Sequence, residues 1–129
     1  MIDHVGFPVA DAERSRLFYE AALTPIGITL IMTVTPEQAG GDATHHGFGS
    51  EGKAFFWVGD DEKVGKGTHI AFAAPTRAAV DAFHAAALKA GGKDNGAPGP
   101  RPHYGPTYYG AFVCDPDGNN IEAVCRASE

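Results

Sequence analysis

An internal repeat limits what this chain can fold into more than any other feature of its sequence. Two segments, each a short strand pattern followed by an amphipathic helix pattern, occur 65 positions apart. The matched positions are a histidine, a helix-capping residue, a phenylalanine and a leucine: His4 and His69, Asp11 and Thr76, Phe18 and Phe83, Leu23 and Leu88. Because a repeat of this length is one supersecondary unit that must bury its apolar face against a neighbour, the sequence predicts two modules of similar fold.

Both modules are predicted to begin with a strand and a helix and to continue with further strands. In the first, a strand over residues 1–9 precedes a helix over 10–23, and strands follow at 28–34, 43–49 and 53–58. In the second, a strand over 67–73 precedes a helix over 76–88, and strands follow at 107–114 and 119–124. The pattern predicts an α+β fold of two tandem βαβββ modules, about residues 1–60 and 67–129. Since 129 residues suit a single domain, the two modules should form one domain over residues 1–129.

The segment from residue 92 to 110 differs from its surroundings. It is rich in glycine and proline, which favours a surface loop. It also carries Arg101, His103, Tyr104, Tyr108 and Tyr109. Loops over a rigid scaffold often carry binding groups. A plain surface loop and a loop whose side chains bind a ligand are therefore equal alternatives for this segment.

The last predicted strand carries a carboxylate at its centre. Glu122 lies between Ile121 and Ala123, after a turn from Asp115 to Gly118. A carboxylate in an apolar strand must be solvated, paired or bound to a metal, because burying it alone is costly.

Strand alternation places three potential metal ligands on one face of the predicted sheet. If the apolar positions face the helices, then His4, His69 and Glu122 face the opposite, concave side. Two imidazoles and one carboxylate form an open divalent-metal site with positions left for water or substrate. The other helix and strand histidines, His45, His46 and His84, fit no such scheme and are predicted to be structural.

Composition excludes several classes of partner. The net charge is −6 and no Lys/Arg cluster occurs, which argues against nucleic acid and anionic membranes. No apolar run reaches the roughly 18 residues of a membrane span, and the first residues do not resemble a signal peptide, so we expect a cytoplasmic protein. Cys114 and Cys125 lie too far apart along the predicted hairpin to pair, so we expect free thiols.

The paired modules, the first-strand histidines and the closing segment DPDGNNIE together resemble the vicinal oxygen chelate superfamily. This superfamily contains glyoxalase I, extradiol dioxygenases, fosfomycin-resistance enzymes and bleomycin-resistance proteins. The resemblance covers essentially the whole chain. It implies a partly closed sheet around a metal and substrate cavity. It also implies a divalent ion (Fe, Ni, Mn or Zn) bound by His4, His69 and Glu122, with Glu122 as the catalytic carboxylate.

The chain departs from the glyoxalase I pattern at one ligand. That enzyme takes a fourth ligand from the last strand of its first module, where this chain has Phe56 or Trp57. A set of three ligands resembles the metal site of the extradiol dioxygenases. The sequence signature of those enzymes allows a histidine at the spacing of His103, but it has a tyrosine where this chain has Phe112. The resemblance therefore implies a glyoxalase-like metalloenzyme acting on a small molecule with adjacent oxygens. Two alternatives are an Fe(II) extradiol-type dioxygenase and a metal-free binding protein in which Trp57 stacks on a flat ligand.

Two further expectations concern the cavity and the assembly. One of Tyr108 and Tyr109 should line the cavity with His103 and Trp57. A strict four-residue turn selects Tyr109, and a register shifted by one residue selects Tyr108, which the family pattern favours. Because one module cannot close a cavity alone, we expect a homodimer, with the modules paired either within a chain or between two chains.

Overall fold

The computed structural model describes residues 2–128 and has the predicted α+β architecture. The first module contains β1 (Val5–Pro8), α1 (Ala12–Leu23), a short 3-10 helix (Thr24–Ile26), β2 (Thr29–Val34), α2 (Pro36–Ala39), β3 (His45–Ser50) and β4 (Lys53–Gly59). The second contains β5 (His69–Ala73), α3 (Arg77–Lys89), β6 (Lys93–Pro100), β7 (Tyr109–Cys114) and β8 (Asn120–Cys125). Two four-stranded mixed sheets result, in the orders β1-β4-β3-β2 and β5-β8-β7-β6. The fold class is confirmed, and the two sheets remain open.

Both long helices begin where the sequence predicts. The Asp11 side chain accepts from the backbone N–H of Arg14, and the Thr76 side chain accepts from that of Ala79. Each cap satisfies one of the backbone donors that a helix start leaves unpaired. The repeated phenylalanines, Phe18 and Phe83, are both buried.

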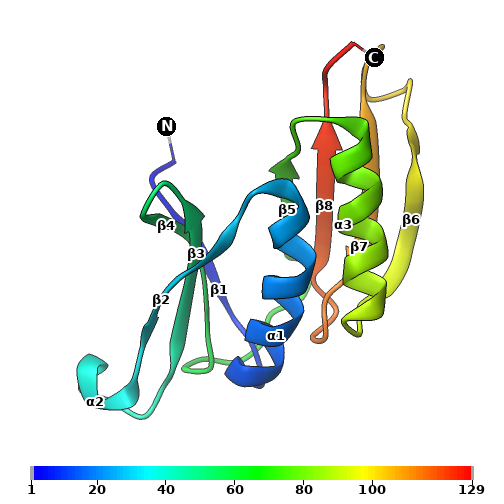
Figure 1. Ribbon diagram of the computed structural model, residues 1–129. Coiled ribbons are helices and arrows are strands. Elements are labelled where there is room, and N and C mark those ends of the chain that lie inside the picture. The colour runs from blue at the N-terminus through cyan, green and yellow to red at the C-terminus, as the bar shows by residue number, and fades with distance from the viewer. Residues whose placement is uncertain (1, 129) are drawn as a thin grey trace.

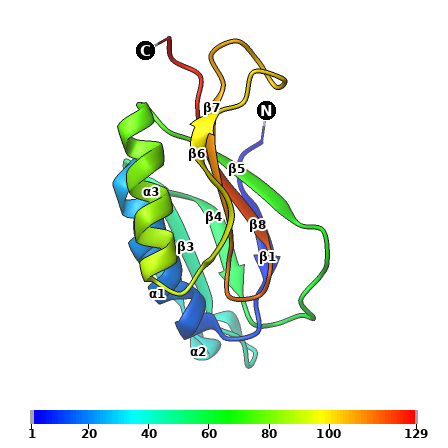
Figure 2. The same cartoon turned by 90° about the vertical axis from the view of Figure 1, so that its right-hand side faces the viewer.

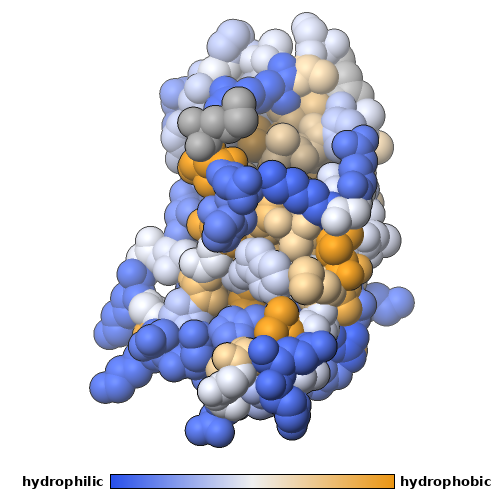
Figure 3. All heavy atoms as spheres, turned by 90° about the vertical axis from the view of Figure 1, so that its left-hand side faces the viewer, coloured by the Kyte–Doolittle hydropathy of each residue, from blue (hydrophilic) through white to orange (hydrophobic). Residues whose placement is uncertain are grey.

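Each helix covers one face of the sheet in its own module, and the two helices also pack against each other (Figures 1 and 2). Within residues 2–128 no helix covers the opposite face of either sheet, and we call these two surfaces the open faces. None of the helices in this range is long and apolar enough to cross a membrane. The module 1 side of the molecule exposes hydrophobic residues between polar ones (Figure 3).

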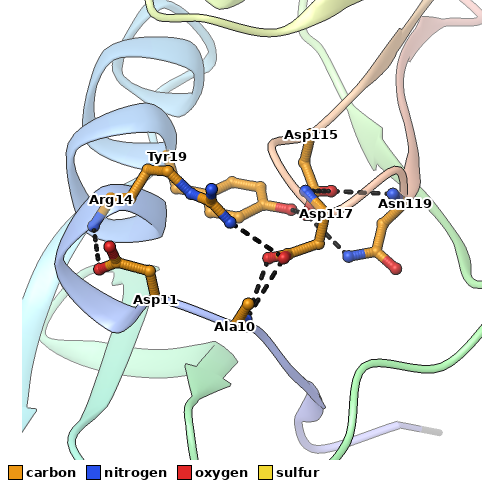
Figure 4. Close-up of polar contacts among 7 residues, drawn as sticks. All are labelled: Ala10, Asp11, Arg14, Tyr19, Asp115, Asp117 and Asn119. Carbon is orange, nitrogen blue, oxygen red and sulfur yellow. Dashed lines mark hydrogen bonds and ion pairs between the residues drawn. The ribbon is translucent and has the colours of Figure 1, made fainter.

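The modules are joined by an apolar contact and a buried polar network. The rings of Phe56 in β4 and Phe72 in β5 meet edge to face at 5.1 Å. The Tyr19 hydroxyl of α1 donates to the buried Asp115 carboxylate at the start of the β7–β8 turn, at 2.7 Å (Figure 4). Asp115 also accepts from the Asn119 side chain and from two backbone N–H groups of its own turn. Arg14 pairs with Asp117 of the same turn. This turn therefore attaches module 2 to the helix of module 1.

The prediction of a loop over residues 92–110 is wrong for the first half of this segment, which forms β6. This strand pairs only with β7 and lies at the edge of its sheet, with an interrupted register. Proline and glycine are tolerated there because an edge strand need not donate along its outer side. Residues 101–108 form the remaining loop. Cys114 and Cys125 do not form a disulfide, as predicted.

Candidate functional site

The register of the last hairpin determines which side chains share a face with Glu122. Glu122 pairs with Phe112 of β7 and with Ala71 of β5. Its neighbours Ile121 and Ala123 are buried toward the helix side. Glu122 therefore points to the open face of the module 2 sheet, where His69 and Tyr108 also lie.

Glu122 is the chemical centre of this face. Its side chain is 2% exposed, and its Oε2 lies 3.0 Å from Nε2 of the half-exposed His69. The Tyr108 hydroxyl donates to the other oxygen, Oε1. Burial, together with the adjacent Glu122 carboxylate, raises the pKa of Tyr108 to about 12, so this hydroxyl keeps its proton at neutral pH. Among residues 2–128, Glu122 has no lysine or arginine as an ion-pair partner.

A hollow of about 550 Å³ opens above the carboxylate, and we call it the Glu122 pocket. Its size suits a small organic ligand. Its walls are mainly aromatic and cationic, and the lining residues are His69, His103, Tyr104, Tyr108, Phe112, Glu122 and Arg126. The Arg126 guanidinium lies over the Tyr108 ring at 4.8 Å, and the His103 and Tyr104 rings are 4.1 Å apart. The pocket therefore offers flat surfaces and positive charge beside one buried carboxylate.

Of the two tyrosines considered from the sequence, Tyr108 lies in this pocket and Tyr109 does not. The shifted register, with Phe112 opposite Glu122, is the observed one. It turns Tyr109 to the helix side, where its hydroxyl donates to Asp81 of α3 at 2.7 Å. The expected substrate-binding role of Tyr109 is therefore wrong for this pocket, because strand alternation places the two rings on opposite faces.

His4 and Trp57 lie elsewhere in the chain. His4 is exposed just before β1, with its Nδ1 2.9 Å from Asp3, and lines a separate hollow of about 430 Å³. Trp57 lies on the open face of the module 1 sheet, packed over Gly6 and Gly47, in a hollow with His45 and Asp61. No group of three potential ligands occurs among residues 2–128, so one chain brings together only His69 and Glu122.

The register also settles which residue stands at the missing ligand position. Trp57 pairs with Gly6 as Glu122 pairs with Ala71, and both pairs are related by the 65-residue offset. Trp57, not Phe56, is thus the module 1 counterpart of Glu122. Phe56 is buried on the helix side.

The residues of the Glu122 pocket fit a divalent cation in part. A nearly buried carboxylate whose contacts are a hydroxyl and an imidazole has an uncompensated charge that a cation would satisfy. His69 and Glu122 supply the nitrogen and oxygen donors that Zn, Fe, Ni and Mn accept. A protein site with open positions uses three such ligands, so one more donor is required.

The remaining histidines have structural contacts, as predicted. His46 is buried beside the Thr33 hydroxyl at 2.9 Å, and burial lowers its pKa. His84 contacts Asp94, and His45 contacts Asp61.

The sequence alone did not identify Arg126 as a pocket residue, and it pointed to Phe112 only as a departure from the extradiol signature. Both could have been found from the hairpin. Phe112 is the cross-strand neighbour of Glu122, and Arg126 lies four positions beyond it on the same side of the strand.

The family model described as the Glyoxalase/Bleomycin resistance protein/Dioxygenase superfamily matches residues 1–123. A search of curated proteins finds no match. Among solved structures, a glyoxalase/bleomycin resistance protein from Albidiferax ferrireducens T118 is 30% identical, with a TM-score of 0.75 and coverage of 98% of this chain and 99% of that one.

Glyoxalase I from Zea mays is 27% identical, with a TM-score of 0.72. The match covers 96% of this chain and 45% of the maize chain, so this chain spans less than half of that enzyme. A family enzyme from Burkholderia phytofirmans PsJN has the same fold at 20% identity, with a TM-score of 0.71 and coverage of 97% and 98%. With the predicted fold and its two repeated modules, these matches show that the chain belongs to the glyoxalase/bleomycin resistance protein/dioxygenase superfamily, the vicinal oxygen chelate superfamily.

Proposed function

We propose that this protein is a glyoxalase-like, metal-dependent enzyme that acts on a small molecule with adjacent oxygens. We further propose that its complete site forms between two copies of the chain. The observation that carries the proposal is the buried Glu122 carboxylate on an open sheet face, contacted by His69 and Tyr108.

The arrangement of the modules supports a site shared between chains. Within one chain the helices α1 and α3 pack together, and each sheet keeps one open face. Trp57 lies on the open face of module 1, and His69 and Glu122 lie on that of module 2. His4 lies just before β1, at the position that matches His69 in the repeat. If module 1 of a second copy covers module 2 of the first, His4 becomes the third ligand and Trp57 becomes a wall of the cavity. A closed two-fold arrangement makes both sites equivalent.

The chain's own residues have distinct roles in this proposal. His69, Glu122 and His4 of a second copy would hold the ion, which would polarise the adjacent oxygens of a bound substrate. The Tyr108 hydroxyl orients Glu122 through Oε1 and holds a proton at the pocket wall. Phe112 and Tyr104 provide flat surfaces that exclude water from a bound ligand.

Two other activities have specific support. An iron-dependent extradiol cleavage is favoured by the three-ligand set and by His103 at the pocket wall. A metal-free binding function is favoured by the aromatic lining and by Trp57 at the position of a fourth ligand.

The deciding experiment is metal analysis of the purified protein, followed by activity assays after loading with Fe(II), Ni(II), Mn(II) or Zn(II). The proposal predicts about one ion per chain, and activity on substrates with adjacent oxygens. A dimer should sediment at micromolar concentration. Protein that binds none of these ions, even at excess metal, would contradict the enzyme proposal and leave the binding function.

A further inference from the structure

We propose that Arg101 forms an anion-binding subsite next to the Glu122 pocket, and that the substrate carries a carboxylate which binds there. This inference deepens the proposed function, and it rests on that function for the statement that the bound molecule is a substrate. The subsite itself is argued from Arg101 and its surroundings alone.

The subsite is a hollow of about 400 Å³ beside the Glu122 pocket, and we call it the Arg101 hollow. Its lining contains one charged group, the Arg101 guanidinium, and otherwise amides, two rings and a glycine: Asn95, Gly96, Tyr104, Phe112 and Asn120. The Asn95 amide donates to Oδ1 of Asn120, which leaves the Asn120 amide nitrogen as a donor toward a ligand. A hollow with several donors and no carboxylate attracts anions.

The guanidinium is held in place by the backbone of β6. Its Nη2 donates to the Ala97 carbonyl at 2.7 Å, and its Nη1 donates to the Gly99 carbonyl at 3.0 Å. It lies 5.6 Å from the centre of the Phe112 ring. Within residues 2–128 it forms no ion pair with a carboxylate. Arg101 is therefore a positioned cation whose charge is not neutralised, in a chain whose net charge is −6.

Gly96 makes room for this arrangement. Its φ is +154°, and a Cβ added there would lie 2.9 Å from the Phe112 ring and 3.4 Å from Nη2 of Arg101. A side chain at this position would displace the ring, the guanidinium or both. The glycine-rich sequence of β6 therefore accommodates the arginine as well as forming an edge strand.

The Glu122 pocket and the Arg101 hollow share part of their walls. Tyr104 and Phe112 line both of them, and the Phe112 ring is 6.3 Å from the His69 ring and 5.6 Å from the Arg101 guanidinium. A ligand bound at Glu122 could thus extend past Phe112 to the guanidinium. One guanidinium neutralises one negative charge, so a singly charged carboxylate suits the hollow better than a doubly charged phosphate.

The test uses metal-free purified protein and three probes: benzoate, uncharged benzyl alcohol and inorganic phosphate. Binding is followed by NMR, using the backbone amide of Gly96 and the side-chain amide of Asn120. We expect benzoate to bind more tightly than the other two probes. Arg101→Gln should weaken benzoate binding about tenfold, since a charge-assisted pair is lost. Asn120→Asp is nearly isosteric and places a like charge in the hollow, so it should weaken binding similarly even if Arg101→Gln fails to fold.

Two controls separate position from total charge. Arg16→Gln removes a guanidinium from α1, where it pairs with Glu13 and Glu20, and Lys89→Gln removes a charge from the end of α3. Each should change benzoate affinity less than twofold. Equal binding of benzoate and benzyl alcohol, tighter binding of phosphate, or an equal loss of benzoate affinity in Arg16→Gln and Arg101→Gln would overturn the inference. Because no metal is needed, failure of metal binding would defeat the proposed function without deciding this result.

Discussion

The open faces of the two sheets have the same framework and different chemistry. At equivalent positions, β4 carries Trp57 and β8 carries Glu122. Around Trp57 the neighbouring strands have Gly6 and Gly47, and a Cβ at Gly47 would collide with the indole ring. Around Glu122 they have Ala71 and Phe112, and the carboxylate contacts His69 and Tyr108.

The helix sides, in contrast, have stayed alike. Phe18 and Phe83 are fully buried at matched helix positions, and both helices begin with a side-chain cap. The repeat therefore preserves what each module needs to fold, while one open face has become a wall that carries an indole ring and the other a site that carries a carboxylate. The two open faces complement each other only when the face that carries Trp57 covers a face that carries Glu122.

The helix sides should show the largest effects on stability. Phe18→Ala and Phe83→Ala should each lower the free energy of unfolding by about 3–5 kcal/mol, because both remove a large ring from a close-packed core. Leu17→Ala, at a 56% exposed position of α1, should cost about 1 kcal/mol or less. Urea unfolding followed by circular dichroism measures all three. A cost confined to one phenylalanine would show that the two modules are not energetically alike.

The open faces should differ most in metal binding. Glu122→Gln keeps the shape of the side chain and removes the charged ligand, so metal affinity measured by calorimetry should fall about 100-fold or more. Trp57→Phe, at the equivalent position of module 1, should change it only a few-fold. Comparable losses in the two variants would remove the distinction between wall and polar site.

The polar network between the modules should show a moderate effect. Tyr19→Phe leaves the buried Asp115 with one hydrogen bond fewer and should lower the free energy of unfolding by about 1–3 kcal/mol. Tyr109→Phe is the matched control, because its hydroxyl donates to the exposed Asp81, and it should cost about 0.5 kcal/mol or less. Thermal unfolding of both variants tests this, and equal costs would argue against a special role for the network.

The smallest effect concerns the titration of Tyr108. Its pKa in the folded protein is raised from the ordinary 10.0 to about 12. The stabilisation linked to its proton is therefore fully present below about pH 10 and is lost as pH rises through about 12. Absorbance of the ionised tyrosine, compared between wild type and Tyr108→Phe, should differ only above about pH 11. A difference already present at pH 10 would mean that Glu122 does not hold this hydroxyl.

The repeat made the fold predictable because its signals are local. Caps at Asp11 and Thr76 and the buried phenylalanines need only neighbours within a few residues, and the structure has them where expected. The strand β6 escaped prediction because its glycines and prolines oppose strand formation locally, and only its edge position permits them.

The site was predictable only within a module. Alternation correctly places Glu122 and His69 on one face, but the choice between Tyr108 and Tyr109 depended on a one-residue register that turn residues alone did not determine. The position of His4 relative to the other ligands depends on how modules pack, which no local pattern specifies. Arg101 was noted as a residue of a loop, and the position of its side chain beside β6 depends on backbone carbonyls and a glycine that approach it only in the folded chain.

The central claim is that His4 of one chain completes the site of His69 and Glu122 in another, and mixed dimers test it most directly. His4→Ala and Glu122→Gln, each alone, should bind almost no metal. When the two variants are unfolded together in equal amounts and refolded, mixed dimers contain one intact site. The mixture should therefore recover about a quarter of the wild-type metal content, since half of the dimers are mixed and each restores one of two sites. No recovery on mixing, or full metal binding by a monomer, would contradict the account.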